Sequence, residues 1–181
     1  LNPAGLKGKR LGIARNLLGF LPQVDELIEK AIETMKNAGA EIIDPADIPH
    51  RGEYGDDEFE VLLYEFKDGL NKYFKTVNKS LPVHSLEELV KYNGQNKSKT
   101  MPHFGQEILT MAQERGDLTD KKYLDALKKM KKLAGKEGLD AITQKHKLDA
   151  IVAATGSPAW PTDWINGDHF TGGCSSPAAC A

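Results

Sequence analysis

The last residues of the sequence bring together side chains of the kind found in nucleophile loops. Residues 172–176 read GGCSS, which places a thiol and two hydroxyls beside glycines whose N–H groups could stabilise an oxyanion. Pro177 follows directly and has no N–H, so it removes a donor where an oxyanion hole needs one. Cys174 and His169 could form a thiolate–imidazolium pair, but no motif places a residue to orient the imidazole. We therefore favour a loop without a catalytic role.

Other polar residues in this region have the types that bind metals. They are Asp163, Asp168, His169, Cys174 and Cys180. Their spacing matches no recognised zinc pattern, so the sequence predicts neither a metal nor another cofactor. A disulfide closing so small a loop beside a proline would do little for the fold, so we expect two free thiols in a reducing compartment.

A second group of residues follows a predicted strand at residues 148–153. Open α/β sheets bind ligands outside the carboxyl ends of their strands, and this strand opens into a Thr-Gly-Ser loop. The substrate-pocket candidates are Thr155, Trp160, Asp163, Trp164 and Asp168. In this interpretation the tryptophans form a pocket wall, and one of the two aspartates faces a polar group of the substrate. The alternative is a packed loop whose tryptophans cover the edge of the sheet.

The elements that position these residues begin with a strand, a helix and a strand. Residues 9–15 and 40–43 are short apolar runs typical of buried strands. Between them, apolar residues from Val24 to Ala38 recur at offsets of three and four, which predicts an amphipathic helix. A connection of this kind predicts a βαβ unit with parallel strands, so the fold class is α/β.

The middle of the chain is predicted to be helical. We expect helices at residues 57–77, 85–94, 104–114 and 119–134, with a polar loop at 93–99. Ser85 is the predicted N-cap of the second helix, with Glu88 at the capping-box position. The apolar stripes at 59–74 and 123–134 are interpreted as core. Six lysines lie between residues 121 and 132, and the interleaved Asp120 and Asp125 favour a solvated helix face over a phosphate or nucleic-acid site.

Composition narrows the function classes. The net charge of −2 over 181 residues gives no reason to expect nucleic acid or an anionic membrane as a partner. No apolar run approaches the roughly 20 residues that cross a bilayer, and residues 1–8 carry no apolar leader. We therefore expect a cytoplasmic protein with no membrane partner.

Two stretches of the sequence resemble a known family. Residues 148–163 (LDAIVAATGSPAWPTD) and 166–179 (NGDHFTGGCSSPAA) closely resemble the later part of amidase signature enzymes, and residues 5–14 are similar to the segment that follows the family's catalytic half. The WPTDW stretch looks most like the amidases related to peptide amidases. The resemblance implies a three-layer α/β/α piece with a short, mainly parallel sheet and several helices, as part of the amidase signature fold. It also implies hydrolysis of carbon–nitrogen amide bonds through a Ser–cis-Ser–Lys triad.

The resemblance assigns no catalytic residue to this chain. The family's signature loop reads Gly-Gly-Ser-Ser-Gly-Gly-Ser, whereas Pro177, Ala178 and Ala179 stand where it requires Gly-Gly-Ser. The order of segments differs too, since the signature loop precedes the part of the family that resembles residues 5–43. Residues 171–181 match instead a small-residue segment that leads into a strand, expected here just past Ala181.

We therefore interpret residues 1–181 as an incomplete segment of a single amidase signature domain. The triad is expected before residue 1 and the closing strands beyond residue 181, so the segment alone is predicted to be inactive. Its expected partners are the remainder of its parent chain and a small amide or peptide-amide substrate, and exposed strand edges predict self-association. Two alternatives stay open. One is a non-catalytic binding or scaffold module of the same fold, and the other is a glutamine-dependent amidotransferase subunit.

Overall fold

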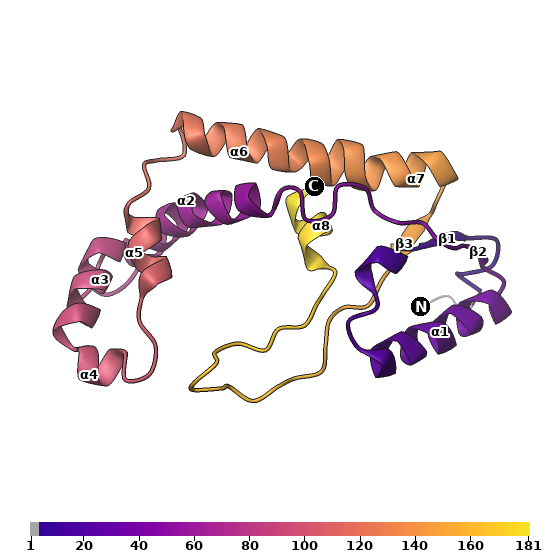
Figure 1. Ribbon diagram of the computed structural model, residues 1–181. Helices are drawn as coiled ribbons and strands as arrows, with labels where there is room; N and C mark the ends of the chain where they lie inside the picture. The colour runs from indigo at the N-terminus through magenta and orange to yellow at the C-terminus, as the bar shows by residue number, and fades with distance from the viewer. Residues whose placement is uncertain (1–3) are drawn as a thin grey trace. The chain divides into compact units, whose positions relative to one another are not determined.

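The computed structural model describes residues 4–181, which form two compact units (Figure 1). Unit 1 comprises residues 4–54 with Met130–Ala181, and unit 2 comprises Gly55–Lys129. That both units belong to one domain of a larger fold stays a prediction.

Unit 1 is built on three parallel strands in the order β2-β1-β3. The strands are β1 (Arg10–Ile13), β2 (Glu41–Ile43) and β3 (Ala150–Val152). Leu11 is in register with Ile42 on one side and Ala150 on the other. The 3-10 turn η1 (Arg15–Leu17) and helix α1 (Pro22–Asn37) connect β1 to β2. The predicted parallel βαβ unit and the third strand are therefore confirmed.

Helices cover both faces of this sheet, which confirms the α/β class and the three layers. Figure 1 shows α1 on one face and α7 (Asp140–His146) on the other, preceded by a π-helical stretch, η2 (Lys132–Leu139). A short helix, α8 (Ser175–Cys180), packs against η2, so the expected lead-in to a further strand is helical. The central strand β1 is buried on both faces, as parallel strands usually are.

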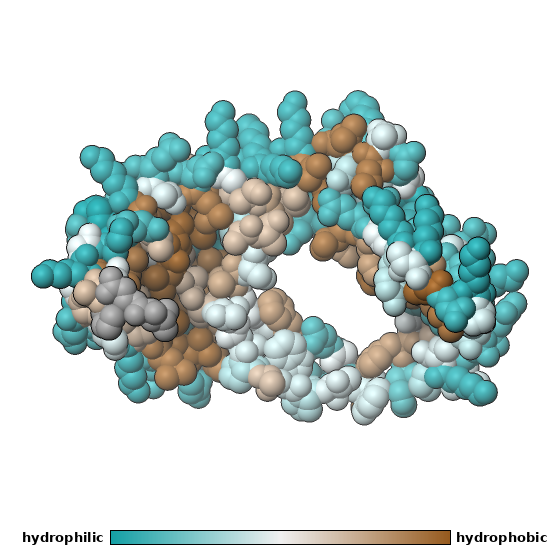
Figure 2. Space-filling view, turned by 180° about the vertical axis from the view of Figure 1, so that it is seen from behind, coloured by the Kyte–Doolittle hydropathy of each residue, from teal (hydrophilic) through white to brown (hydrophobic). Residues whose placement is uncertain are grey.

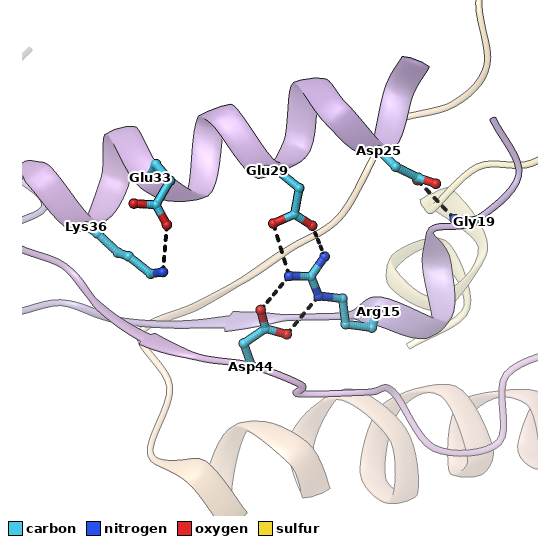
Figure 3. A network of polar contacts seen from close by, with 7 residues as sticks. All are labelled: Arg15, Gly19, Asp25, Glu29, Glu33, Lys36 and Asp44. Carbon is cyan, nitrogen blue, oxygen red and sulfur yellow. Dashed lines mark hydrogen bonds and ion pairs between the residues drawn. The ribbon is translucent and has the colours of Figure 1, made fainter. Parts of the chain in front are cut away.

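An arginine after β1 ties α1 to the end of β2 (Figure 3). Arg15 Nε donates to Asp44 Oδ1 at 2.8 Å, and its Nη2 donates to Asp44 Oδ2 at 2.5 Å. Arg15 also pairs with Glu29 of α1. The hydrogen bonds from Arg15 are the main reason why the pKa values of Asp44 and Glu29 lie below their ordinary values.

Replacing Arg15 with Met is expected to lower the free energy of unfolding by about 1 kcal/mol at pH 7, because two carboxylates lose their common partner. Both carboxylates have depressed pKa values in the folded state, so their contribution is present at neutral pH and is lost as the pH falls through those folded values. The deficit of the variant should therefore shrink below about pH 4 in urea unfolding followed by circular dichroism. Lys121→Met is the control, since Lys121 forms a largely exposed ion pair with Asp125 in unit 2. An equal deficit at pH 7 and pH 3 would contradict the assignment.

Unit 2 is helical. Its helices are α2 (Gly55–Phe74), α3 (Leu86–Gln95), α4 (Lys97–Thr100), α5 (Glu107–Gln113) and the beginning of α6 (Lys121–Lys131). Leu63, Leu86 and Ala112 form the centre of its core, contributed by α2, α3 and α5. Ser85 caps α3 as predicted, since its Oγ accepts from Glu88 N at 3.1 Å.

Two predictions for unit 2 are wrong. Residues 93–99 are helical rather than a loop, because α3 runs to Gln95 and α4 begins at Lys97. The stripe on α2 is not all core, because Leu62 and Tyr73 are 55% and 60% exposed while Leu63 is buried. Figure 2 shows that apolar side chains reach the molecular surface. Self-association of the chain stays a prediction.

Side chains of α2 and α6 are joined by polar and aromatic contacts. Tyr64 Oη donates to Asp120 Oδ2 at 2.8 Å, and burial together with this hydrogen bond raises the pKa of Tyr64 to about 12. The ring of Tyr64 lies 5.5 Å from that of Tyr123. Four of the six clustered lysines form ion pairs, which supports the solvated-face interpretation: Lys121 with Asp125, Lys122 with Glu60, Lys129 with Asp57 and Lys132 with Glu137.

Candidate functional site

The loop that follows β3 closes on itself. Figure 1 shows it as the long connection between β3 and α8. Gly156 pairs with Gly173 in an isolated antiparallel bridge, and Cys174 N donates to Thr155 O at 3.4 Å. The bridge brings the two backbones close together, since a Cβ added at Gly173 would lie 3.1 Å from Thr155 O. Thr155 is therefore placed at the neck of the loop.

Asp163 organises the turn at the other end of the loop. Its Oδ1 accepts from the backbone N–H groups of Ile165 and Asn166 at 2.8 and 2.9 Å. Its Oδ2 accepts from Asn166 Nδ2 at 2.9 Å and contacts His169 Nε2 at 3.1 Å. Gly167 completes the turn with a φ of 87°, a left-handed conformation that favours glycine. The hydrogen bonds from Asn166, then those from Ile165 and His169, hold the pKa of Asp163 well below its ordinary value.

Asp168 is engaged with an indole. Trp160 Nε1 donates to Asp168 Oδ1 at 2.7 Å, and the ring centroids of Trp160 and Phe170 are 6.1 Å apart. Both predicted acidic candidates thus have partners within the loop.

Some of the residues that the sequence predicted for the site contact one another in the structure, and others have different partners. It pairs Trp160 with Asp168, and it places His169 against Asp163 rather than beside Cys174, a pairing that the sequence allowed but did not favour. Trp164 is 61% exposed.

Sequence reasoning missed two residues of the same loop, Ile165 and Phe170, which are 91% and 64% exposed. A signal was present, because Ile165 is an apolar residue inside a stretch whose Asn-Gly pair predicts a tight turn.

Cys174 lies instead in an apolar hollow of unit 1, close to the carboxyl end of β3. The hollow measures about 360 Å³ and is lined by Leu17, Ile48, Leu139, Ile151, Val152, Ala153, Cys174, Pro177 and Ala178. None of the predicted pocket residues lines it. Apart from the Cys174 thiol, the side chains that line it are apolar, so the hollow can hold an apolar group. Whether the predicted residues contact a substrate stays a prediction.

Two further properties concern the whole described chain. Within residues 4–181, no group of three or more His, Cys, Asp or Glu side chains could hold a metal ion. Over the same residues, no helix combines the length and apolar character needed to cross a membrane.

The parallel sheet, its covering helices and the loop after β3 form an α/β segment whose fold matches solved amidase structures, as the sequence predicted. The chain is related to the peptide amidases. It is 38% identical to the peptide amidase PAM in its complex with the competitive inhibitor chymostatin, with a TM-score of 0.90, over 99% of this chain and 36% of that one. The native peptide amidase from Stenotrophomonas maltophilia matches with 38% identity and a TM-score of 0.86, over 99% of this chain and 35% of that one.

A more distant structure agrees. An amidase family protein from Bacillus anthracis str. Ames is 26% identical, with a TM-score of 0.66, over 83% of this chain and 28% of that one. No protein-family model matches the sequence, and neither does any curated protein. The chain thus spans about a third of the length of the peptide amidases it matches. The predicted resemblance, its peptide-amidase subgroup and the interpretation as an amidase segment are confirmed.

Proposed function

We propose that this chain is part of an enzyme that hydrolyses the terminal carbon–nitrogen bond of peptide amides. One observation carries the proposal: the match to peptide amidase extends over 99% of the chain at 38% identity. In the reaction a serine oxygen attacks the amide carbonyl and the serine hydroxyl gives up its proton. The amide nitrogen takes up a proton, the C–N bond breaks and ammonia leaves. Water then releases the acid and regenerates the serine.

The Ser–cis-Ser–Lys triad of this proposal lies in polypeptide outside the chain. Pro177, Ala178 and Ala179 leave no serine at the position of the nucleophile, and proline offers no oxyanion donor. The contribution of this chain is one wall of the substrate pocket, formed by the loop after β3 with Thr155, Trp160, Asp163, Trp164 and Asp168. No cofactor is required.

The proposed partners are the remaining polypeptide of the enzyme and a small amide or peptide-amide substrate. The proposed compartment is the cytoplasm. Cys174 and Cys180 are both free thiols, which is the usual state of cysteines in a reducing compartment.

A segment exchange tests the proposal. In the test protein these 181 residues replace the matching segment of the Stenotrophomonas maltophilia peptide amidase, and ammonia release from N-acetyl-L-phenylalanine amide is measured. We expect hydrolysis by the exchanged enzyme and none by the 181-residue chain alone. Replacement of the nucleophilic serine of the host enzyme with Ala is the control and should abolish turnover.

Three outcomes would count against the proposal. Hydrolysis by the 181-residue chain alone would show that the triad does not lie outside this chain. A folded exchanged enzyme that releases no ammonia would refute the amidase assignment. Release of ammonia from glutamine but not from peptide amides would favour the amidotransferase alternative.

A further inference from the structure

The hydrophobic core of unit 1 is open on one side, where it forms the floor of the apolar hollow beside Cys174. Ala14, Leu17 and Ile48 are the buried centre of this part of the core, with exposed fractions of 0%, 3% and 4%. Partly buried side chains pack against that centre: Leu139, Ile151, Ala153 and Cys174. Apart from Ala14, all of these residues also line the hollow, so the hollow is continuous with the core.

The hollow is large for a space beside a core. It measures about 360 Å³, whereas protein interiors are close-packed and leave few voids larger than a water molecule. An engineered apolar cavity of about 150 Å³ takes up benzene, so the hollow has room for about two large apolar side chains. A core surface of this size and character is one that other apolar groups bind.

The side chains that line the hollow favour a polypeptide over a peptide-amide substrate as its occupant. Among them only the Cys174 thiol can form a hydrogen bond, and a thiol is a weak donor. A substrate amide enclosed there would find almost no side-chain partner for the hydrogen bonds that it gives up to water, which costs free energy. An apolar side chain of a polypeptide needs no such partner, because its own backbone can stay outside the hollow.

Polypeptide is available in the enzyme to which we assign the chain. The match to peptide amidase covers 99% of this chain and 36% of that one, so more than half of that enzyme's polypeptide lies outside the matched segment. Leu17, Ile48 and Ala153 place the hollow at the carboxyl ends of the three strands. Open α/β sheets also bind ligands at these ends, so the substrate is the rival occupant that an experiment has to exclude.

We infer that the hollow is an interface within the enzyme, and that an apolar segment of the remaining polypeptide inserts one or two large side chains into it beside Cys174. The inference rests on the proposed function in so far as this chain is part of a larger enzyme, and it deepens that proposal by locating the contact. Cys174 reports on the contact, because its partly buried thiol becomes enclosed when the segment docks.

Alkylation of Cys174 by N-ethylmaleimide tests whether the hollow is covered. The rate is measured by peptide mass in the 181-residue chain and in the exchanged enzyme, both without substrate. We expect Cys174 to react at least about tenfold more slowly in the exchanged enzyme, because the reactivity of a thiol depends on access to it. Cys180 is the matched control, since it is 3% exposed in this chain and should react slowly in both proteins.

Three results of this measurement would overturn the inference. The first is an equal Cys174 rate in the chain and in the folded exchanged enzyme. The second is protection of Cys174 in the exchanged enzyme only when millimolar N-acetyl-L-phenylalanine amide is present, which would assign the hollow to the substrate. The third is protection in the isolated chain that increases with its concentration, which would assign the hollow to a second copy.

Filling the hollow provides a second test, which does not depend on the isolated chain. Ala178 and Ala179 are neighbouring exposed residues of α8, and of the two only Ala178 lines the hollow. Ala178→Leu should lower the melting temperature of the exchanged enzyme by about 2 °C or more, because the larger side chain competes with the docked segment for space. Ala179→Leu is the matched control and should change the melting temperature by less than about 1 °C.

Equal shifts for the two alanine variants would also count against the inference. So would an unchanged melting temperature of Ala178→Leu together with a loss of kcat/KM for N-acetyl-L-phenylalanine amide relative to N-acetylglycine amide, which would assign the hollow to the substrate side chain. A folded exchanged enzyme that protects Cys174 but releases no ammonia would support the inference and overturn the proposed function alone.

Discussion

Replacing Gly12 with Ala is expected to destabilise unit 1 by about 1–3 kcal/mol, the usual cost of overpacking a well-packed core. Gly12 lies in the middle of β1, where an added Cβ would come within 2.5 Å of Leu148 Cδ1 and 2.8 Å of Ala46 Cβ. Leu148 can change its rotamer, but Ala46 Cβ is bound directly to the backbone and cannot move away by itself. Strand β1 is paired on both sides and cannot shift easily either.

Gly69→Ala is the matched control for this substitution. Gly69 lies in α2 and has nothing within 4 Å of the added Cβ. That variant should be neutral or more stable by up to about 1 kcal/mol, because alanine is the better helix former. Urea unfolding gives the free energies, and hydrogen exchange resolved by peptide separates the two units. Equal stability of Gly12→Ala and the unaltered chain would show that Leu148 and Ala46 are not packed against β1 as described.

The second large effect is expected in unit 2, from Arg115→Met. Arg115 Nε lies 2.6 Å from Glu60 Oε1, and the two side chains are only 17% and 14% exposed. Lys122 contacts the same carboxylate oxygen at 2.9 Å. Removing Arg115 leaves a largely buried carboxylate with a single, more exposed partner. The expected loss is about 2 kcal/mol, below the 3–5 kcal/mol measured for fully buried pairs.

The pH dependence identifies the cause of this loss. Burial raises the pKa of Glu60, but the hydrogen bonds from Lys122 and Arg115 lower it by more, so the net pKa lies below its ordinary value. The stabilisation from Glu60 is therefore present at neutral pH and is lost as the pH falls through the folded pKa. The deficit of Arg115→Met should shrink below about pH 4.

Two controls accompany the Arg115 variant. Lys121→Met removes an ion pair with Asp125 that is largely exposed, and it should change stability little. The double variant Arg115→Met/Glu60→Met should recover much of the loss, because no unpaired charge remains. A deficit that persists at pH 3 and in the double variant would assign it to lost packing instead.

The elements of unit 1 could be predicted because their periodicity is local. The alternation of short apolar runs with one amphipathic helix defines β1, α1 and β2 from sequence neighbours alone. The third strand was predicted for the same reason, and the family resemblance rested on contiguous residues from 148 to 179.

The parts that were missed depend on contacts that no periodic pattern encodes. The α2 stripe is too wide for one partner, so Leu63 is buried while Leu62 is exposed, and the sequence alone does not distinguish them. Residues 97–100 are polar, yet they form a turn of helix in which Thr100 Oγ1 donates to Asn96 O at 3.2 Å. The closure of the loop after β3 depends on Gly156 and Gly173, whose pairing is not visible in any local window.

The order of the strands has a consequence for how the chain is made. In the finished sheet β1 pairs with β3, which lies far along the chain. At this edge Arg10 N donates a hydrogen bond to Asp149 Oδ2, which is 139 positions away in the sequence. At translation rates of about 5–20 residues per second, one edge of β1 stays unpaired for on the order of ten seconds until β3 is synthesised. The helices of unit 2 lie between β2 and β3 in the sequence, so they are synthesised before β3 and can fold by local contacts first. During synthesis the nascent β1–α1–β2 unit therefore exposes one unpaired edge of β1, a site where other chains can pair.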